Sequence, residues 1–214
     1  MHVVLDNLDL YLEGMRLTVE LTLGSFALAL VLGTITAAAR VSPVPPLRAA
    51  GAFYVETVRN TPLLVIFVLF YFGLPKAGVK YSPLASAIIV LALYTGTFVA
   101  ETVRSGINAV ASGQAEAARS LGLTFPQTLG LVVLPQAFRT VVPALGSVFI
   151  ALIKNSSVAL VIGVHELTFQ GDHLAQVTAQ AIPVYLGVAV AYLLLALPSG
   201  WLVSVIERKV AVKR

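Results

Sequence analysis

Five long apolar stretches constrain this chain more than any other feature of its sequence. They cover about residues 17–39, 61–75, 83–103, 131–153 and 183–206. A helix needs about 20 mostly apolar residues to cross the hydrocarbon core of a bilayer. Because 58% of the residues are hydrophobic and only 11% are charged, a soluble domain is excluded. The sequence therefore predicts an all-α integral membrane protein with five transmembrane helices.

The basic residues predict how these helices are oriented. An odd number of spans places the termini on opposite sides of a cell membrane. With the N-terminus outside, ten of the 14 Lys and Arg residues fall on the cytosolic side: Arg40, Arg48, Arg59, Arg104, Arg119, Arg139, Arg208, Lys209, Lys213 and Arg214. The positive-inside rule therefore favours an N-out, C-in arrangement. The acidic start of the chain lacks the pattern of a signal peptide, so we expect it to be retained.

A polar segment, residues 112–135, separates the third and fourth apolar stretches, and we call it the elbow. Ser112 can cap a short helix, Glu116 suits the positive end of that helix dipole, and Gly122 can end the helix in a left-handed turn. The orientation above places the elbow in the cytosol. Local chemistry fits an ordinary loop between two spans equally well.

The second half of the elbow carries the signals of another helix. Thr124 offers an N-cap, Pro126 suits the first turn, and Gln127 can complete a capping box. The side chains of the first helix are mostly small, which leaves it thin enough for the groove of another protein. The residues concerned are Ala115, Ala117 and Ala118, with Glu116 and Arg119 as polar contacts.

Polar side chains inside the third stretch share one helical face. Tyr94, Thr97 and Glu101 are separated by three and four residues. Such groups face the protein or a watery cavity rather than lipid, or they join helices through hydrogen bonds. Thr97 fits both interpretations, whereas for Glu101, which lies near Arg104, we expect a helix-joining contact or a contact at the cytosolic end.

We expect the span formed by the fourth stretch to start after Pro135 and to reach a polar cluster, Lys154 to Ser157. Pro143 can bend this helix, and a lysine in this position needs a carboxylate or backbone carbonyls as partners. The apolar segment 158–164 is too short to cross a bilayer and predicts an outer half-helix or gate. We expect a solvated loop to carry His165 and His173.

Shorter signals complete the pattern. Three prolines after Arg40 predict a turn, which is followed by an interfacial helix at 47–58. Glu20 fits a water-facing position at the rim of the first span. Because the sequence contains no cysteine, no thiolate metal site is available, and the scattered basic residues do not indicate nucleic-acid binding.

An ordered series of motifs resembles the polar-amino-acid permeases of ABC importers over roughly residues 10–210. The elbow carries Glu116-Ala117-Ala118 and Gly122 in the pattern of the EAA loop of that family. Other matching segments are Arg59 to Leu64, Tyr94 to Ile107, Gly113-Gln114, Leu134 to Ala137 and Lys154 to Ser157. The run 114–122 and the ending Ala211-Val212-Lys213 are most similar to actinobacterial glutamate permease subunits.

The resemblance implies a type I importer permease, one transmembrane domain over residues 1–214. Its implied partners are a second permease subunit (a paralogue or another copy), two ATP-binding subunits and an extracellular amino-acid-binding protein. Residues Glu116, Ala117, Ala118, Arg119 and Gly122 would contact the ATPase. Since the sequence contains no GxxxxGK[ST] loop, ATP and Mg would be bound by that partner, and this chain would have neither catalytic nor metal-binding residues.

The substrate of such an importer would be a polar amino acid. Its carboxylates need cationic or donor groups, and its ammonium needs acceptors. The best available residues are Lys154, Asn155, Ser156, Thr97 and Tyr94, with Arg59 beside Asn60 as a second choice. Asn60 and Asn155 to Ser157 depart from the usual family residues. These departures weaken any assignment of the ligand to particular residues. From the overall likeness we favour glutamate, with glutamine, aspartate and basic amino acids as alternatives. A secondary transporter, a channel subunit or a membrane scaffold is the alternative class of function.

Overall fold

The computed structural model describes residues 2–210, and every regular element in this part of the chain is a helix. The all-α prediction is therefore confirmed. The α-helices are α1 (His2–Leu5), α2 (Leu8–Val41), α3 (Pro45–Arg59), α4 (Leu63–Gly73), α5 (Pro83–Ala109), α6 (Ser112–Ser120), α7 (Phe125–Gln127), α8 (Leu134–Asn155), α9 (Leu167–Thr178) and α10 (Ala181–Val210). Three tighter or wider helical segments are η1 (Leu74–Ala77), η2 (Thr128–Val133) and η3 (Ser156–Ile162).

Four helical segments are long and apolar enough to cross a membrane. They are α2, α5, the run Phe125–Ile162 that contains α8, and α10. At 1.5 Å per residue, the 34 residues of α2 extend about 51 Å, which exceeds the hydrocarbon thickness of about 30 Å. These segments confirm four of the five expected spans.

The second expected span, 61–75, corresponds to α4 and η1, which reach the length of a membrane crossing only together with α3. The helices α3 and α4 meet at an angle of 103°, and α4 has only 11 residues. Pro62 explains the break, because proline disfavours the helical conformation at the residue before it and cannot donate a backbone hydrogen bond. The expected interfacial helix at 47–58 corresponds to α3.

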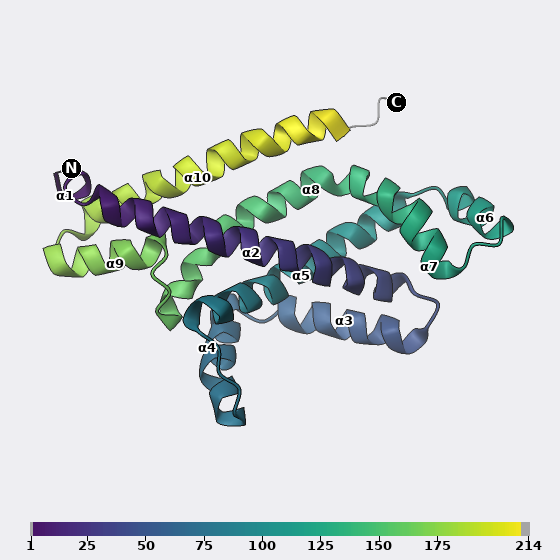
Figure 1. The fold of residues 1–214 in the computed structure, drawn as a ribbon, viewed down its shortest axis with the longest axis horizontal. Coiled ribbons are helices and arrows are strands. Elements are labelled where there is room, and N and C mark those ends of the chain that lie inside the picture. Colours follow the sequence, from purple (N-terminus) through teal and green to yellow (C-terminus); the bar gives the residue numbers. More distant parts are fainter. Residues whose placement is uncertain (1, 211–214) are drawn as a thin grey trace.

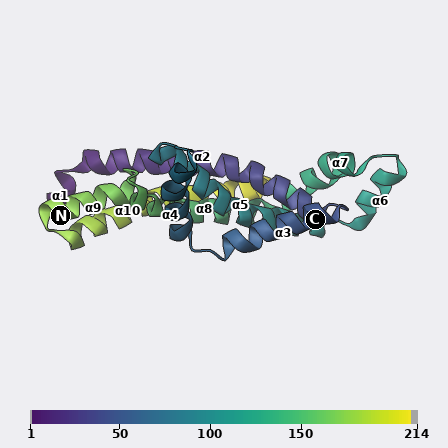
Figure 2. The same ribbon diagram turned by 90° about the horizontal axis from the view of Figure 1, so that it is seen from below.

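The elbow and the N-terminus lie at opposite ends of an elongated molecule. Figure 1 shows α1 and α9 at one end and α6 and α7 at the other, and Figure 2 confirms that α6 extends past the ends of the long helices. The C-terminal end of α10 points toward the elbow end. This arrangement fits termini on opposite sides of a membrane.

Three apolar clusters hold the helices together. Leu21, Phe67, Leu91 and Leu152 join α2, α4, α5 and α8 in the centre. The second cluster packs α9 and α10 against the start of α2, and the third packs α2, α5 and α8 near the elbow end. The elbow is thus attached to α5 and α8, two of the helices that form the third cluster.

Candidate functional site

The first helix of the elbow ends as the sequence predicts but begins differently. Gly122 has a φ of +83°, and its N–H donates to the Arg119 carbonyl at 2.9 Å while Leu123 N–H donates to Ala118 at 3.2 Å. This pair of bonds is a Schellman motif. The prediction that Ser112 caps the helix is wrong: Ala111 occupies the cap without a side-chain bond, and Ser112 is already helical.

The second helix of the elbow starts at the expected cap. Thr124 has an extended backbone, and its N–H donates to Gln127 Oε1 at 2.9 Å. Pro126 lies in the first turn. The helix then widens into the π-helical segment η2, which runs directly into α8.

The expected start of the fourth span after Pro135 is therefore wrong, because the helix already begins at Phe125. A proline ring would clash with the carbonyl one turn earlier in a regular α-helix. In η2 the last bond is instead a wide one, from Leu134 N–H to the Leu129 carbonyl. The wider turn leaves room for Pro135 without ending the helix.

Most of the predicted coupling residues face outward. Glu116, Ala117, Arg119 and Gly122 are exposed, whereas Ala118 is only 5% exposed. Ala118 therefore supports the elbow from inside. The side chain of Leu121, at the end of α6, is 84% exposed. The surface available to a partner thus combines one carboxylate, one guanidinium and a protruding leucine.

A small hollow of about 240 Å³ lies beneath the elbow. Its walls include Val41 at the end of α2, Ile107 of α5, Ala115 and Arg119 of α6, and Phe125. The hollow separates α6 from the ends of the long helices. The elbow is consequently joined to them mainly through its own chain connections to α5 and α8.

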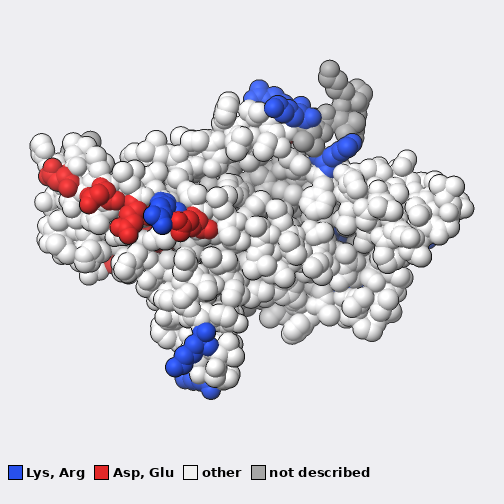
Figure 3. Space-filling view, viewed as in Figure 1, with Lys and Arg blue, Asp and Glu red and all other residues white. Residues whose placement is uncertain are grey.

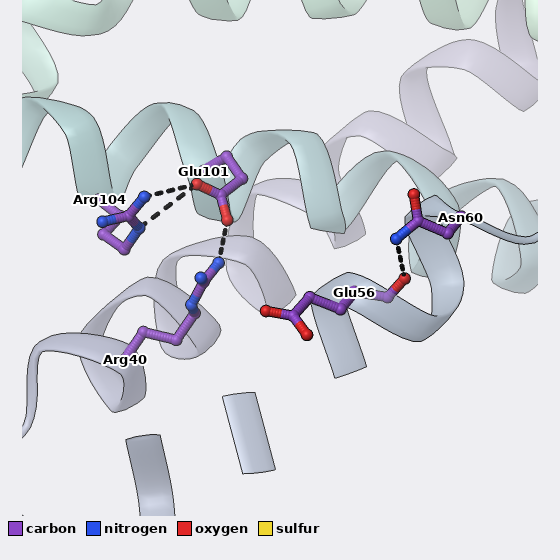
Figure 4. Close-up of polar contacts among 5 residues, drawn as sticks. All are labelled: Arg40, Glu56, Asn60, Glu101 and Arg104. Atoms are coloured by element: carbon purple, nitrogen blue, oxygen red, sulfur yellow. Dashed lines mark hydrogen bonds and ion pairs between the residues drawn. The ribbon is translucent and has the colours of Figure 1, made fainter. Parts of the chain in front are cut away.

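One ion pair ties α2 to α5 near the base of the elbow, and a second ion pair, within α5, shares the same carboxylate. Arg40 and Arg104 both donate to the carboxylate of Glu101, Arg104 Nη2 at 2.9 Å from Oε2 (Figure 4). The side chain of Arg40 is 14% exposed, that of Arg104 is 35% exposed and that of Glu101 is 25% exposed. Glu101 thus joins two helices, which is one of the two contacts that the sequence predicted for it. Sequence reasoning missed Arg40, because 61 residues separate it from Glu101.

One group of predicted substrate residues gathers where α3 meets α5. The Arg59 guanidinium lies 5.9 Å from the ring centre of Phe98, and that ring lies 5.3 Å from the ring of Tyr94. Thr97 is fully buried, and its hydroxyl donates to the Tyr94 carbonyl at 2.7 Å. Asn60 follows Arg59 and donates to the Glu56 carbonyl at 2.8 Å (Figure 4).

The other group lies at the end of α8. Lys154 is exposed, while Ser156 is buried and donates to the Ile153 carbonyl at 2.7 Å. Asn155 is half-buried. Within residues 2–210, no hydrogen bond or ion pair joins Lys154 to Thr97 or Arg59. The predicted substrate residues therefore come from two parts of the fold, the region where α3 meets α5 and the end of α8.

The sequence did not indicate that Glu166 has a buried carboxylate. Glu166 is 0% exposed and caps α9: its two oxygens accept the N–H groups of Thr168 and Phe169 at 2.8 and 2.9 Å. The Tyr192 hydroxyl of α10 also donates to it, at 2.8 Å. Burial raises the pKa of Glu166, although these hydrogen bonds oppose the shift. The cap thereby joins α9 to α10.

The loop expected around His173 is in fact the helix α9. Its apolar face, which includes Leu167 and Leu174, packs against α10 and the start of α2. The polar residues of the other face obscured this pattern. The signal available for this helix was Glu166, an acidic residue that can cap a helix, followed by Leu167 and Leu174 at helical spacing.

Comparison with known families gives a match over most of the chain. The family described as binding-protein-dependent transport system inner membrane component matches residues 29–212. A probable glutamine ABC transporter permease protein, GlnM of Bacillus subtilis, is 39% identical over 207 residues, which are 97% of this chain and 96% of the relative. The glutamate transport system permease protein GluC of Corynebacterium glutamicum is 40% identical over 216 residues, 95% of each chain.

Solved structures show the same arrangement of helices. The crystal structure of an amino acid ABC transporter with histidines contains a chain that is 34% identical, with a TM-score of 0.86 and 96% of each chain covered. The inward-facing MetNI methionine ABC transporter matches with a TM-score of 0.81 at 22% identity, over 96% of this chain and 98% of that one. The second likeness concerns the fold alone.

Proposed function

Because this chain belongs to the family of binding-protein-dependent transport system inner membrane components, and is thus a multi-pass permease subunit of an amino-acid ABC importer, we propose that it imports glutamate. Relatives with 40% and 39% identity are named for glutamate and glutamine. The relative named for glutamate and the likeness to actinobacterial permeases favour glutamate. Glutamine is the second candidate, ahead of aspartate and basic amino acids.

The observation that carries the proposed mechanism is the elbow, which extends past the long helices at the end where the positive-inside rule places the cytosol (Figure 2). We assign its exposed residues Glu116, Ala117, Arg119 and Gly122 to the contact with an ATP-binding subunit. Two such subunits, which bind ATP and Mg, would serve a pair of permease subunits. An extracellular binding protein would deliver the amino acid.

Alternating access then follows from the chain connections of the elbow. Its first helix continues from α5 across only Val110 and Ala111, and its second helix runs through η2 into α8. When ATP draws the two ATP-binding subunits together, each elbow moves with its subunit and tilts α5 and α8. The ion pair between Glu101 and Arg40 transmits the same motion to α2.

For the substrate we retain both groups of residues as the proposed contacts. Lys154, with Asn155 and Ser156, offers a cation and donors for a carboxylate. Thr97 and Tyr94 lie in the middle of α5, and Arg59 is the second choice for the carboxylate. A Lys154→Ala permease should take up glutamate more slowly at limiting concentration, and wild-type uptake by this variant would place the site elsewhere.

Charge reversal in the elbow tests the coupling contact. The assembled transporter, with its ATP-binding subunits and binding protein, is reconstituted in vesicles, and glutamate uptake and ATP hydrolysis are measured together. Like charges brought together at an interface cost several kcal/mol. Glu116→Lys should therefore reduce uptake per ATP by about tenfold or more, with normal insertion in the membrane.

The matched control is Glu207→Lys, which reverses an exposed carboxylate on α10, outside the elbow. It should leave uptake per ATP unchanged. Coupled transport at the wild-type level by the Glu116→Lys transporter would refute the assignment of the elbow. A panel of glutamate, glutamine, aspartate, arginine and cystine, tested with the cognate binding protein, identifies the amino acid in the same vesicles.

A further inference from the structure

An apolar cleft of about 500 Å³ opens between α2, α8 and α10. A cavity of about 150 Å³ in a protein interior can hold benzene, so this cleft accommodates a hydrocarbon several times larger. The rings of Phe26 on α2 and Phe149 on α8 meet edge to face across it, with centres 5.0 Å apart. The amino-acid transport described above gives this cleft no role.

The cleft exists because α10 diverges from α2 (Figure 1). The two helices are joined near the start of α10, where the Tyr11 hydroxyl donates to the Val184 carbonyl at 3.0 Å. Farther along, α10 approaches α8 closely where Val203 packs on Gly146. Beyond the first contact α2 has separated from α10, and the space between them remains open to the surroundings.

The few polar groups in the cleft already have partners. The Thr22 hydroxyl donates to the Thr18 carbonyl at 2.7 Å, and the Ser199 hydroxyl donates to the Leu195 carbonyl at 2.7 Å. The Thr18 hydroxyl accepts the Leu167 N–H at 3.2 Å. With these groups satisfied inside the protein, the cleft favours an apolar occupant.

Charge differs between the two ends of the cleft. Near the elbow end, Arg139 directly follows the lining residue Phe138, and Arg208 and Lys209 lie shortly after the lining residue Ile206. All three basic side chains are exposed, and Glu207 is the acidic residue beside them. Figure 3 shows basic side chains at the C-terminal end of α10.

The opposite end of the cleft is acidic. Figure 3 shows a row of acidic side chains along the start of α2. Glu20 directly follows the lining residue Val19, and its carboxylate accepts a bond from Arg16 at 2.9 Å. An anionic group is therefore attracted to the elbow end and repelled from the other end.

We propose that this cleft binds an anionic phospholipid of the cytoplasmic leaflet. One acyl chain lies between α2, α8 and α10, and the phosphate lies beside Arg139, Arg208 and Lys209. Three features together fit this ligand: walls formed by membrane-spanning helices, an interior without free hydrogen-bonding groups, and a positive charge at one end of the cleft only. A second copy of the permease would need no positive charge there.

Filling the cleft tests the acyl-chain site. The assembled transporter is reconstituted in vesicles of equal parts phosphatidylglycerol and phosphatidylcholine, then extracted mildly, and the lipids retained per permease are counted by native mass spectrometry. Ser199→Trp fills the cleft and should remove a retained phosphatidylglycerol. Ser204→Trp is the matched control, since Ser204 is exposed on the same helix outside the cleft and makes the same kind of bond to its own helix.

Retention of phosphatidylglycerol by Ser199→Trp at the wild-type level would overturn the proposal. Should Ser199→Trp prevent assembly, Val142→Phe fills the cleft from the wall formed by α8, and the same two outcomes apply. A Ser199→Cys permease that crosslinks to its partner permease through a short reagent would also overturn the proposal, because the cleft would then be a protein interface.

Removing the charges tests the headgroup site. Two juxtamembrane basic residues together raise the affinity for anionic lipids by about 30-fold at most. The double variant Arg208→Gln, Lys209→Gln should lose most of the preference for phosphatidylglycerol over phosphatidylcholine while retaining one lipid. The control Lys76→Gln, Lys80→Gln changes two basic residues after α4. An unchanged preference in the first variant would refute the headgroup assignment.

Discussion

The crossing of α2 and α5 gives the sharpest test of the packing described above. Gly33 of α2 lies so close to α5 that a Cβ placed on it would be 2.6 Å from Val99 Cβ and 2.8 Å from the Gly96 carbonyl oxygen. Small residues allow helices in membranes to approach in this way. Gly33→Ala adds a single methyl group at this point.

The magnitude of the effect follows from these distances. Carbon atoms normally pack about 3.5–4.0 Å apart, so the methyl group must displace the α5 backbone or Val99 by about 1 Å. Overpacking of this kind costs about 1–3 kcal/mol. Replacing glycine by alanine inside a helix contributes up to about 1 kcal/mol in the opposite direction.

Gly24→Ala is the matched control on the same helix. A Cβ on Gly24 would lie 3.5 Å from Ile88 Cδ1, an ordinary contact with the end of a side chain. This variant should show only the gain in helix propensity. The difference between the two variants therefore isolates the crowding, and we expect Gly33→Ala to be the less stable by about 1–3 kcal/mol.

The free energy of unfolding is measured for both permeases in the same detergent by titration with a denaturant, followed by circular dichroism. Retention of the assembled transporter on size exclusion shows whether the helices remain associated. Equal stability of Gly33→Ala and Gly24→Ala would refute the close crossing. A loss in both variants alike would show that the glycines act through the backbone rather than through contact with α5.

Three further predictions concern the elbow, its base and the outer cap. Gly122→Ala forces a left-handed backbone on alanine, at about 1–2 kcal/mol, and should weaken coupling in the vesicle assay, whereas Gly113→Ala in α6 should not. Glu101→Gln leaves Arg40, 14% exposed, without its counterion and should lower the free energy of unfolding by about 1–3 kcal/mol. For Glu166, a raised pKa in the folded state means that its contribution to stability is fully present below the unfolded pKa of about 4.3 and is lost as pH rises through the folded pKa. Glu166→Gln should abolish that part of the pH dependence measured by denaturant titration between pH 4 and 8, and an unaltered profile would contradict the burial argument.

Sequence reasoning succeeded where the relevant interactions are local or set by the bilayer. The elbow is an example: Gly122 adopts the left-handed turn, and Thr124 with Gln127 forms the start of the next helix. The contact between Glu101 and Arg104 spans one helical turn and was therefore visible as spacing. Apolar runs of about 20 residues predicted four of the long helices directly.

Interactions between segments distant in the sequence were not predictable in the same way. The partnership of Arg40 with Glu101 and the bond from Tyr192 to Glu166 depend on which helices lie side by side. The polar face of α9 suggested a loop until its apolar face was seen against α10. Lys154 and Thr97 belong to different helices, α8 and α5, so sequence spacing gives no distance between them.

The sequence by itself determined that this chain is a helical membrane protein with a polar elbow between two spans, because a bilayer requires long apolar helices and turn chemistry acts over a few residues. Only the tertiary structure decided that α3 and α4 form a sharply broken span, that Arg40 closes the base of the elbow, and that an apolar cleft separates α2 from α10. Those features depend on the directions in which helices leave their turns, and small differences in close packing between distant residues set these directions.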